Sequence, residues 1–298
     1  MAVLQFDVYA RTMGRTVTFD AYVPSEALKP GETCKTLYLL HGVQGSYLNW
    51  ITATDLFRLT AAHNATCVDS SANGSGEKKG KRLAIIMPSA GNGFYHRIPY
   101  EQDPSWTAPF GHKHDYEKFV GEELVEITRN MLPLSRERED TAIAGLSMGG
   151  YGALRTALLY PETFGFAGGL SNALITRYKE SMMDGFYVSE GALKTMFGDF
   201  EAQRFTDRED VQCMLEKAVK ENTELPRIYV ACGKQDPLRI LTQELCEAMD
   251  RMKVPYEFEE KDGGHEWAFW EWGLERILSR LSWEFLTGTC SVRTATVP

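Results

Sequence analysis

The stretch that most constrains the fold of this chain is residues 141–152, which read as strand, sharp turn and helix start. An apolar run leads into the pattern Gly145-x-Ser147-x-Gly149, and more small residues follow it. A tight strand-to-helix turn strains the backbone of its central residue, and the flanking glycines leave the serine hydroxyl exposed. The pattern therefore predicts a nucleophile elbow, with the free N–H groups of a helix start beneath Ser147.

Composition and charge narrow the class of protein. The chain has 298 residues, of which 43% are hydrophobic, and this predicts one or two globular domains with a sizeable core. The net charge of −9 disfavours nucleic acid or an anionic membrane as a partner. No apolar run is long enough to cross a bilayer. The first residues lack the basic and apolar regions of a signal peptide, so we expect a cytoplasmic protein.

The order of apolar runs and helical patterns predicts the α/β class. Strands that alternate with helices favour a mostly parallel central sheet with helices on both faces. A hairpin of two strands is expected at residues 2–10 and 16–23, followed by buried strands at 36–40, 83–87 and 141–144 and by further strands at 164–170, 227–232 and 255–259. The expected helices cover residues 55–63, 115–132, 148–160, 238–252 and 268–286. We predict one domain over residues 1–286, with a lid-like insertion at about 171–222 and a polar tail at 287–298.

Three polar residues follow predicted strands and have complementary chemistry. Ser147, Asp236 and His265 occur in the chain order of α/β-hydrolases. Because the carboxyl ends of parallel strands share one edge of the sheet, topology alone brings the three together. A serine hydroxyl needs a base to become a nucleophile, and imidazole titrates near neutral pH. An aspartate would hold the imidazole tautomer and stabilise the imidazolium. Asp262 is a competing acid, but it lies too close in sequence to His265 to orient the ring easily.

The reaction also needs donors for a developing oxyanion. We expect one from the backbone N–H of Met148, which directly follows the serine, and one from Val43, in the loop after the strand at 36–40. Gly42 and Gly45 permit close backbone approach there. His41 is interpreted as a structural residue that holds this loop.

Four motifs in order carry a resemblance to a known family: Leu39-Leu40-His41-Gly42 with Trp50, residues 143–152, residues 233–236, and residues 263–267. Together they resemble the esterase D family of α/β-hydrolases, nearest its tributyrin-esterase-like and cinnamoyl (feruloyl) esterase-like enzymes. The resemblance spans about residues 3–286. It implies ester hydrolysis with no metal and no organic cofactor. It also implies a triad of Ser147, Asp236 and His265, with Val43 and Met148 as oxyanion donors.

The resulting hypothesis is a serine carboxylesterase that cleaves small-molecule esters with short-chain or aromatic (cinnamoyl-type) acyl groups through an acyl-enzyme. The alternatives on the same fold are an S-formylglutathione hydrolase, an acyltransferase and a non-catalytic binding module. The family's S-formylglutathione hydrolases and mycolyl transferases use different residues where this chain has His41-Gly42-Val43-Gln44. A homo-oligomer is left open.

Other residue clusters indicate a function less strongly. Aromatic candidates for the substrate pocket are Trp50, Phe94, Tyr95, Trp106 and Trp267, although core packing is the default for each. His112-x-His114-Asp115 could supply metal ligands, but no third ligand has a supporting spacing, and Asp115 also suits a helix start. The six cysteines form no C-x-x-C pair, and free, mostly buried thiols are expected.

Overall fold

A computed structural model describes residues 2–24, 31–67, 81–98, 114–177 and 208–281 of the chain. Its centre is an eight-stranded sheet with the spatial order β1-β2-β4-β3-β7-β8-β9-β10. In chain order these strands are β1 (Ala2–Ala10), β2 (Arg15–Val23), β3 (Lys35–Leu40), β4 (Leu83–Pro88), β7 (Thr141–Leu146), β8 (Phe166–Leu170), β9 (Arg227–Gly233) and β10 (Tyr256–Lys261). The hairpin β1–β2 and the pair β2–β4 are antiparallel, and every other pair is parallel.

The parallel strands are aligned so that their carboxyl ends meet at one edge. Leu146 at the end of β7 pairs with Leu170 at the end of β8, which in turn pairs with Ala231 near the end of β9. The buried runs in β3, β4 and β7 are nearly continuous because helices cover both faces of these strands. By contrast, β1 alternates between exposed and partly buried residues, as expected of an edge strand.

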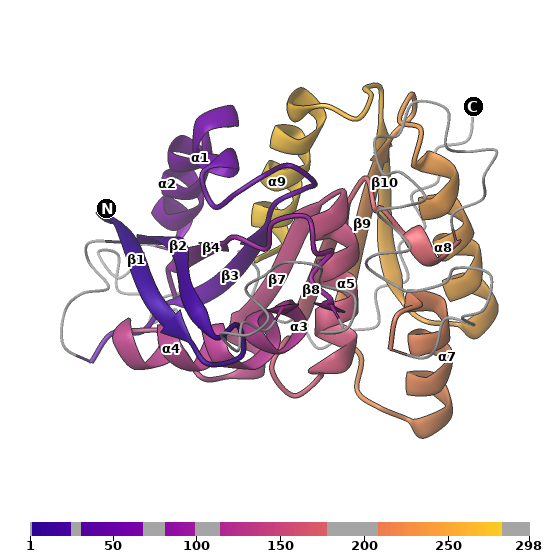
Figure 1. The fold of residues 1–298 in the computed structure, drawn as a ribbon. Coiled ribbons are helices and arrows are strands. Elements are labelled where there is room, and N and C mark those ends of the chain that lie inside the picture. Colours follow the sequence, from indigo (N-terminus) through magenta and orange to yellow (C-terminus); the bar gives the residue numbers. More distant parts are fainter. Residues whose placement is uncertain (1, 25–30, 68–80, 99–113, 178–207, 282–298) are drawn as a thin grey trace, which may run out of the picture.

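Two helical layers enclose the sheet (Figure 1). The helices are α1 (Asn49–Ala53), α2 (Leu56–Thr66), α3 (Tyr116–Lys118), α4 (Leu124–Met131), α5 (Met148–Leu159), α7 (Val211–Glu221), α8 (Arg239–Met252) and α9 (Trp267–Leu281). The side chains of β3 point alternately to the two faces of the sheet. Leu37 and Leu39 pack in the core under α1, α2 and α9. Tyr38 and Leu40 pack in the core under α4, α5, α7 and α8.

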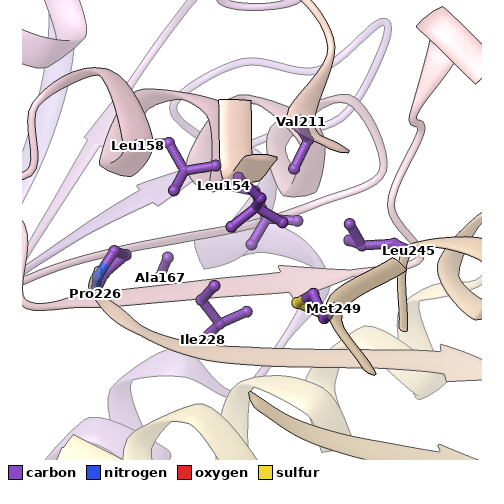
Figure 2. Close-up of a pocket in the computed structure, with 9 residues that line it drawn as sticks. Leu154, Leu158, Ala167, Val211, Pro226, Ile228, Leu245 and Met249 are labelled. Carbon is purple, nitrogen blue, oxygen red and sulfur yellow. The ribbon is translucent and has the colours of Figure 1, made fainter. Parts of the chain in front are cut away.

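A small apolar cavity lies between the sheet and the helices α5, α7 and α8 (Figure 2). Its lining includes Leu154 and Leu158 from α5, and Leu245 and Met249 from α8, which face Ile228 of β9. Helix α7 contributes to this lining, so the end of the segment 171–222 belongs to the helical layer of the domain. Residues 178–207, where the lid-like insertion was expected, lie outside the described residues, as does the tail from 282.

Most expected elements are present, with three differences. The helix expected at 115–132 is divided into α3 and α4 by a π-helical turn, Phe119–Glu123. The short helix α1 was not expected, because its five residues give too little periodicity to detect. A separate two-stranded pair, β5 (Arg97–Ile98) and β6 (His114–Asp115), was also not expected.

Candidate active site

Ser147 occupies the turn between β7 and α5 in a conformation that L-residues rarely adopt, with φ 53° and ψ −116°. The glycines around it are sterically required. A Cβ added at Gly145 would lie 2.5 Å from the carbonyl oxygen of Gly149. A Cβ added at Gly149 would lie 2.6 Å from the carbonyl oxygens of Leu40 and His41. The turn that the sequence pattern predicted is therefore packed closely against the end of β3 and the start of α5.

Ser147 is only 3% exposed, whereas the sequence predicted that its hydroxyl would be exposed. The imidazole of His265 is hydrogen-bonded to Ser147 Oγ, and the backbone of Gly42 packs beside Ser147 Cβ. The hydroxyl is held in place by its neighbours and does not stand free above the sheet.

The loops after β9 and β10 are fastened to each other by backbone contacts. Gln235 N–H donates to the carbonyl of Gly263 at 3.1 Å, and Gly263 N–H donates to Gln235 Oε1 at 2.7 Å. A Cβ at Gly233 would collide with the Gly263 carbonyl, so only glycine allows the two loops to come this close. Gly263 itself has φ 151°, which favours glycine. These contacts bring His265 over the loop that carries Asp236.

The three side chains expected at this edge form one hydrogen-bonded chain. His265 Nε2 lies 3.0 Å from Ser147 Oγ, and His265 Nδ1 lies 2.9 Å from Asp236 Oδ2. Because a carboxylate can only accept, Nδ1 carries the proton and Nε2 is free to accept from the hydroxyl. The competing acid Asp262 is exposed, and its carboxylate lies 3.6 Å from Lys234 Nζ. The structure therefore brings Asp236, and not Asp262, to His265.

The carboxylate of Asp236 is fully buried and yet stays ionised. Burial by itself would raise its pKa, but hydrogen bonds from His265, Ser171 and the Leu238 N–H outweigh burial and lower the pKa. The Leu238 N–H donates to Asp236 Oδ1 at 2.8 Å, which leaves Oδ2 for the imidazole. A buried, charged and oriented acceptor of this kind stabilises an imidazolium.

The loop after β3 is organised around a buried histidine. His41 Nε2 accepts from the Ala90 N–H at 3.0 Å, so its proton is on Nδ1, which donates to the Gly42 carbonyl at 2.7 Å. Tyr95 donates its hydroxyl to the His41 carbonyl at 3.0 Å. Burial lowers the pKa of His41 to about 4, so the ring is neutral near pH 7. These contacts agree with the expectation that His41 holds the loop.

Gly42 brings this loop against the elbow. A Cβ at Gly42 would lie 2.6 Å from Leu146 Cδ1 and 3.4 Å from Ser147 Cβ, so the backbone of the loop runs directly beside the serine. Val43 follows in the same loop, and its side chain packs against the core. Met148 is the first residue of α5, and N–H groups in the first turn of a helix have no intrahelical acceptor.

The aromatic candidates have different positions. Trp50, Phe94 and Tyr95 are fully or almost fully buried in the core, so their position agrees with the default interpretation of core packing. The indole N–H of Trp50 donates to the Leu40 carbonyl at 3.1 Å, and the Tyr95 ring fills the space left by Gly152 on α5. These residues support the loops of the site. Trp267 is partly exposed and packs edge-on against Trp50. Trp106 lies outside the described residues.

A buried ion network anchors the helix that starts at the elbow. Arg155 of α5 is 1% exposed, and its guanidinium is paired with the carboxylate of Glu117 in α3, which also binds Arg208. Burial opposes ionisation of Glu117, but the two arginines outweigh it and lower its pKa. Removing one member of such a network leaves a buried charge uncompensated. Neither this network nor its role in holding α5 was anticipated from the sequence.

The described residues show neither a metal-binding cluster nor a membrane-spanning helix. Within the described ranges, no group of three or more His, Cys, Asp or Glu side chains could hold a metal ion. His112, one of the suggested ligands, lies outside them. No described helix combines the length and the apolar character needed to span a bilayer. The described cysteines are free thiols: Cys34, Cys67, Cys213, Cys232 and Cys246.

Known proteins resemble this chain in sequence and in fold. The family model described as Putative esterase matches residues 10–281. An acetyl esterase of Caldicellulosiruptor saccharolyticus is 32% identical over 282 residues, which cover 91% of this chain and 94% of the relative. An S-formylglutathione hydrolase (FrmB) from Staphylococcus aureus, solved as a crystal structure, has a TM-score of 0.74 at 25% identity and covers 94% of this chain and 98% of its own.

A ferulic acid esterase of known structure has a TM-score of 0.72 at 21% identity and covers 94% of this chain and 97% of its own. At that identity the likeness concerns the fold alone. With the sheet order and the two helical layers, these neighbours confirm the predicted α/β-hydrolase fold.

Proposed function

Since this chain belongs to the Putative esterase family and is a carboxylic ester hydrolase of the serine type, we propose that it removes short acyl groups, acetyl first, from small-molecule esters. The observation that carries the proposal is the position of the His265 imidazole, 3.0 Å from Ser147 Oγ and 2.9 Å from Asp236 Oδ2. The preference for acetyl rests on the relative that is 32% identical across almost the full length of both chains.

In the proposed reaction, Ser147 Oγ attacks the ester carbonyl while His265 Nε2 takes the hydroxyl proton. Asp236 stabilises the imidazolium through its hydrogen bond to Nδ1. The tetrahedral intermediate collapses when His265 returns the proton to the leaving alkoxide, which leaves an acyl-Ser147 ester and a free alcohol. A water molecule then attacks the acyl-enzyme, with His265 again as the base, and the acid and the free serine are released.

The negative charge that develops on the carbonyl oxygen is assigned to the backbone N–H groups of Val43 and Met148. Two features support this assignment: Gly42 brings the loop that carries Val43 beside Ser147, and Met148 opens α5. A helix N-terminus favours negative charge, and donors that are already in place need no reorganisation during the reaction.

Thioester hydrolysis is the second candidate. It is favoured by the S-formylglutathione hydrolase from Staphylococcus aureus, which matches the fold over almost the whole of both chains. An S-formylglutathione hydrolase of Paracoccus denitrificans is 29% identical over 157 residues. An acyl-enzyme on Ser147 serves either an oxygen ester or a thioester, because only the leaving group differs. Aromatic acyl groups are a third class to test, since the fold also occurs in a ferulic acid esterase.

The assignment of the nucleophile is tested with Ser147→Ala. We expect the variant to lose hydrolysis of p-nitrophenyl acetate by at least about 10⁴-fold and to lose labelling by a fluorophosphonate probe. Ser279→Ala is the matched control, because Ser279 is exposed on α9 and bonds only to a local carbonyl among the described residues. Retained turnover or labelling in Ser147→Ala would refute the assignment.

The acyl preference is tested with p-nitrophenyl esters from acetate to octanoate, together with methyl ferulate and S-formylglutathione. The proposal expects the highest kcat/KM for acetate. A kcat/KM for S-formylglutathione that exceeds that for acetate would favour the second candidate. For the cell compartment we propose the cytoplasm, which the free thiols of the described cysteines support.

A further inference from the structure

The base of the proposed triad lies beyond the end of the sheet. The last paired residues of β9 and β10 are Gly233 and Lys261, and the Lys234 N–H donates to the Lys261 carbonyl at 3.0 Å. His265 follows Lys261 by four positions. The pairing of the strands therefore does not by itself fix the imidazole, and contacts of the loop after β10 have to do so.

The residues directly before His265 are two successive glycines, Gly263 and Gly264. Glycine has more backbone freedom than any other residue, so this stretch loses the most conformational entropy when the loop becomes ordered. A reacting group that is misplaced by about 1 Å can lower a rate by about a hundredfold. Catalysis therefore needs contacts that hold these glycines in one conformation.

Gln235, in the loop after β9, binds both polar backbone groups of Gly263. Its backbone N–H donates to the Gly263 carbonyl at 3.1 Å, and its side-chain Oε1 accepts from the Gly263 N–H at 2.7 Å. Because that N–H can only donate, the oxygen of the amide faces it. The N–H of Gly264 donates to Glu266 Oε1 at 2.9 Å, but this bond lies within a single loop and does not hold one loop relative to the other.

The place of Gln235 in the chain connects this contact with the proposed catalytic residues. Gln235 directly precedes Asp236, and Gly263 lies two positions before His265. The contact therefore joins the two loops that carry the hydrogen bond between Asp236 Oδ2 and His265 Nδ1, 2.9 Å long. Among the residues that the structure describes, no other side chain bonds to the backbone of Gly263.

We propose that Gln235 is a positioning residue for the esterase reaction: its Oε1 holds the loop of His265 so that the imidazole stays within reach of Ser147 Oγ. The inference rests on the proposed function of Ser147, Asp236 and His265. The side chain of Gln235 bonds to the backbone of the loop and to none of these three side chains, so its effect on catalysis passes through the position of the imidazole.

The first test is Gln235→Met, which keeps the length of the side chain but removes the acceptor. We expect kcat for p-nitrophenyl acetate to fall about three- to tenfold, the effect of one neutral hydrogen bond. KM should change less than about twofold, and the melting temperature should fall by no more than a few degrees, because Gln235 is exposed. An unchanged kcat, or a fall that only matches a loss of folded protein by circular dichroism, would overturn the proposal.

The acceptor itself is tested with Gln235→Glu, because a carboxylate oxygen can accept from the same N–H. Its kcat, measured on the plateau of the pH profile, should stay within about twofold of that of the unchanged protein. If Gln235→Glu loses as much activity as Gln235→Met, the acceptor has no part in catalysis and the proposal fails.

Lys234→Met is the matched control. It also places a methionine in the loop after β9, and it removes an exposed ion pair between the same two loops, in which Lys234 Nζ lies 3.6 Å from Asp262 Oδ1. We expect its kcat to be unchanged, because exposed ion pairs contribute little and the Gly263 contacts remain. Equal losses in the two methionine variants would contradict a specific role for Gln235.

Hydrogen exchange gives a readout that does not depend on turnover. Loss of the acceptor should speed the amide exchange of a peptide that contains Gly263, measured by mass spectrometry, in Gln235→Met but not in Gln235→Glu. The same exchange rate in Gln235→Met and the unchanged protein would show that Oε1 does not hold the loop, and the proposal would be wrong.

Two further outcomes separate this inference from the proposed function. If His265→Ala loses turnover while Gln235→Met keeps it in full, the positioning role fails and the proposed function stands. If His265→Ala keeps full turnover, the assignment of His265 as the base is what fails, and the positioning role fails with it.

Discussion

The loops after β3 and β10 reach the same edge of the sheet, and each carries a histidine. The two histidines differ in their burial and in their hydrogen-bond partners. His41 is 1% exposed, and both of its ring nitrogens are bonded to the backbone. The side chain of His265 is 22% exposed, and its nitrogens are bonded to Asp236 and Ser147. An imidazole fully engaged by backbone groups acts as part of the scaffold. One that lies between a carboxylate and a hydroxyl can transfer a proton.

The largest expected difference between the two histidines is in activity. His265→Ala should lower kcat/KM by at least about 10⁴-fold, because no other described base lies on Ser147 Oγ. Its free energy of unfolding should change by about 1 kcal/mol or less, since the ring is partly exposed and Asp236 keeps its bond from Leu238. Initial rates with p-nitrophenyl acetate and urea unfolding measure the two quantities. A large loss of stability in His265→Ala would contradict the inference that His265 contributes to activity and His41 to the scaffold.

The next effect is on stability. His41→Ala should lower the free energy of unfolding by about 2–4 kcal/mol, because it leaves the buried N–H of Ala90 and the carbonyl of Gly42 without their imidazole partner. Urea unfolding measures this, with His265→Ala as the paired control. Should His41→Ala prove as stable as the unchanged protein, His41 would not be the scaffold residue that its contacts indicate.

The smallest effect is on the pH dependence of stability. Burial lowers the pKa of both His41 and His63 to about 4, below the ordinary value of 6.5. The unfolded chain therefore binds these protons first, so their contribution is complete above about pH 6.5 and is lost as the pH falls towards 4. Each histidine adds at most about 1.4 kcal/mol per pH unit to the slope.

His63→Gln sharpens this test because it removes one buried titrating group far from the site. Urea unfolding at several pH values between 4 and 7 should give a shallower slope for the variant than for the unchanged protein. The same slope in both proteins would show that His63 does not contribute to acid unfolding.

The sequence predicted this fold well because its strands are apolar runs that end at polar, glycine-rich turns. Parallel strands bring such ends together, and for this reason Ser147, Asp236 and His265 could be grouped before any distance was known. The sequence also favoured Asp236 over Asp262, and the structure brings Asp236 to the imidazole. The sequence could separate the two acids because a carboxylate only three residues from the histidine cannot easily turn back onto its ring.

The positions of other side chains at the site could not be predicted from the sequence, because residue type does not reveal which way a side chain points. Phe94 and Tyr95 occur in a glycine-rich segment, which suggested a pocket, but positive φ values at both turn them into the core. Ser171 follows a glycine-rich strand in an unremarkable sequence, and no motif marks it. Its buried contact with the indole of Trp270, a residue 99 positions away, becomes visible only in the structure.

The pairing of Leu146 with Leu170, and of Leu170 with Ala231, fixes the relative positions of the ends of β7, β8 and β9. Adjacent strands are held about 4.8 Å apart by their hydrogen bonds, whatever side chains they carry. The strands that lead to Ser147 and Asp236 are separated by β8 alone, and the His265 imidazole bridges the gap between the hydroxyl and the carboxylate. The alignment of the proposed catalytic residues therefore depends on the register of the backbone, and we expect a one-residue slip of β8 to disturb it without changing any of their side chains.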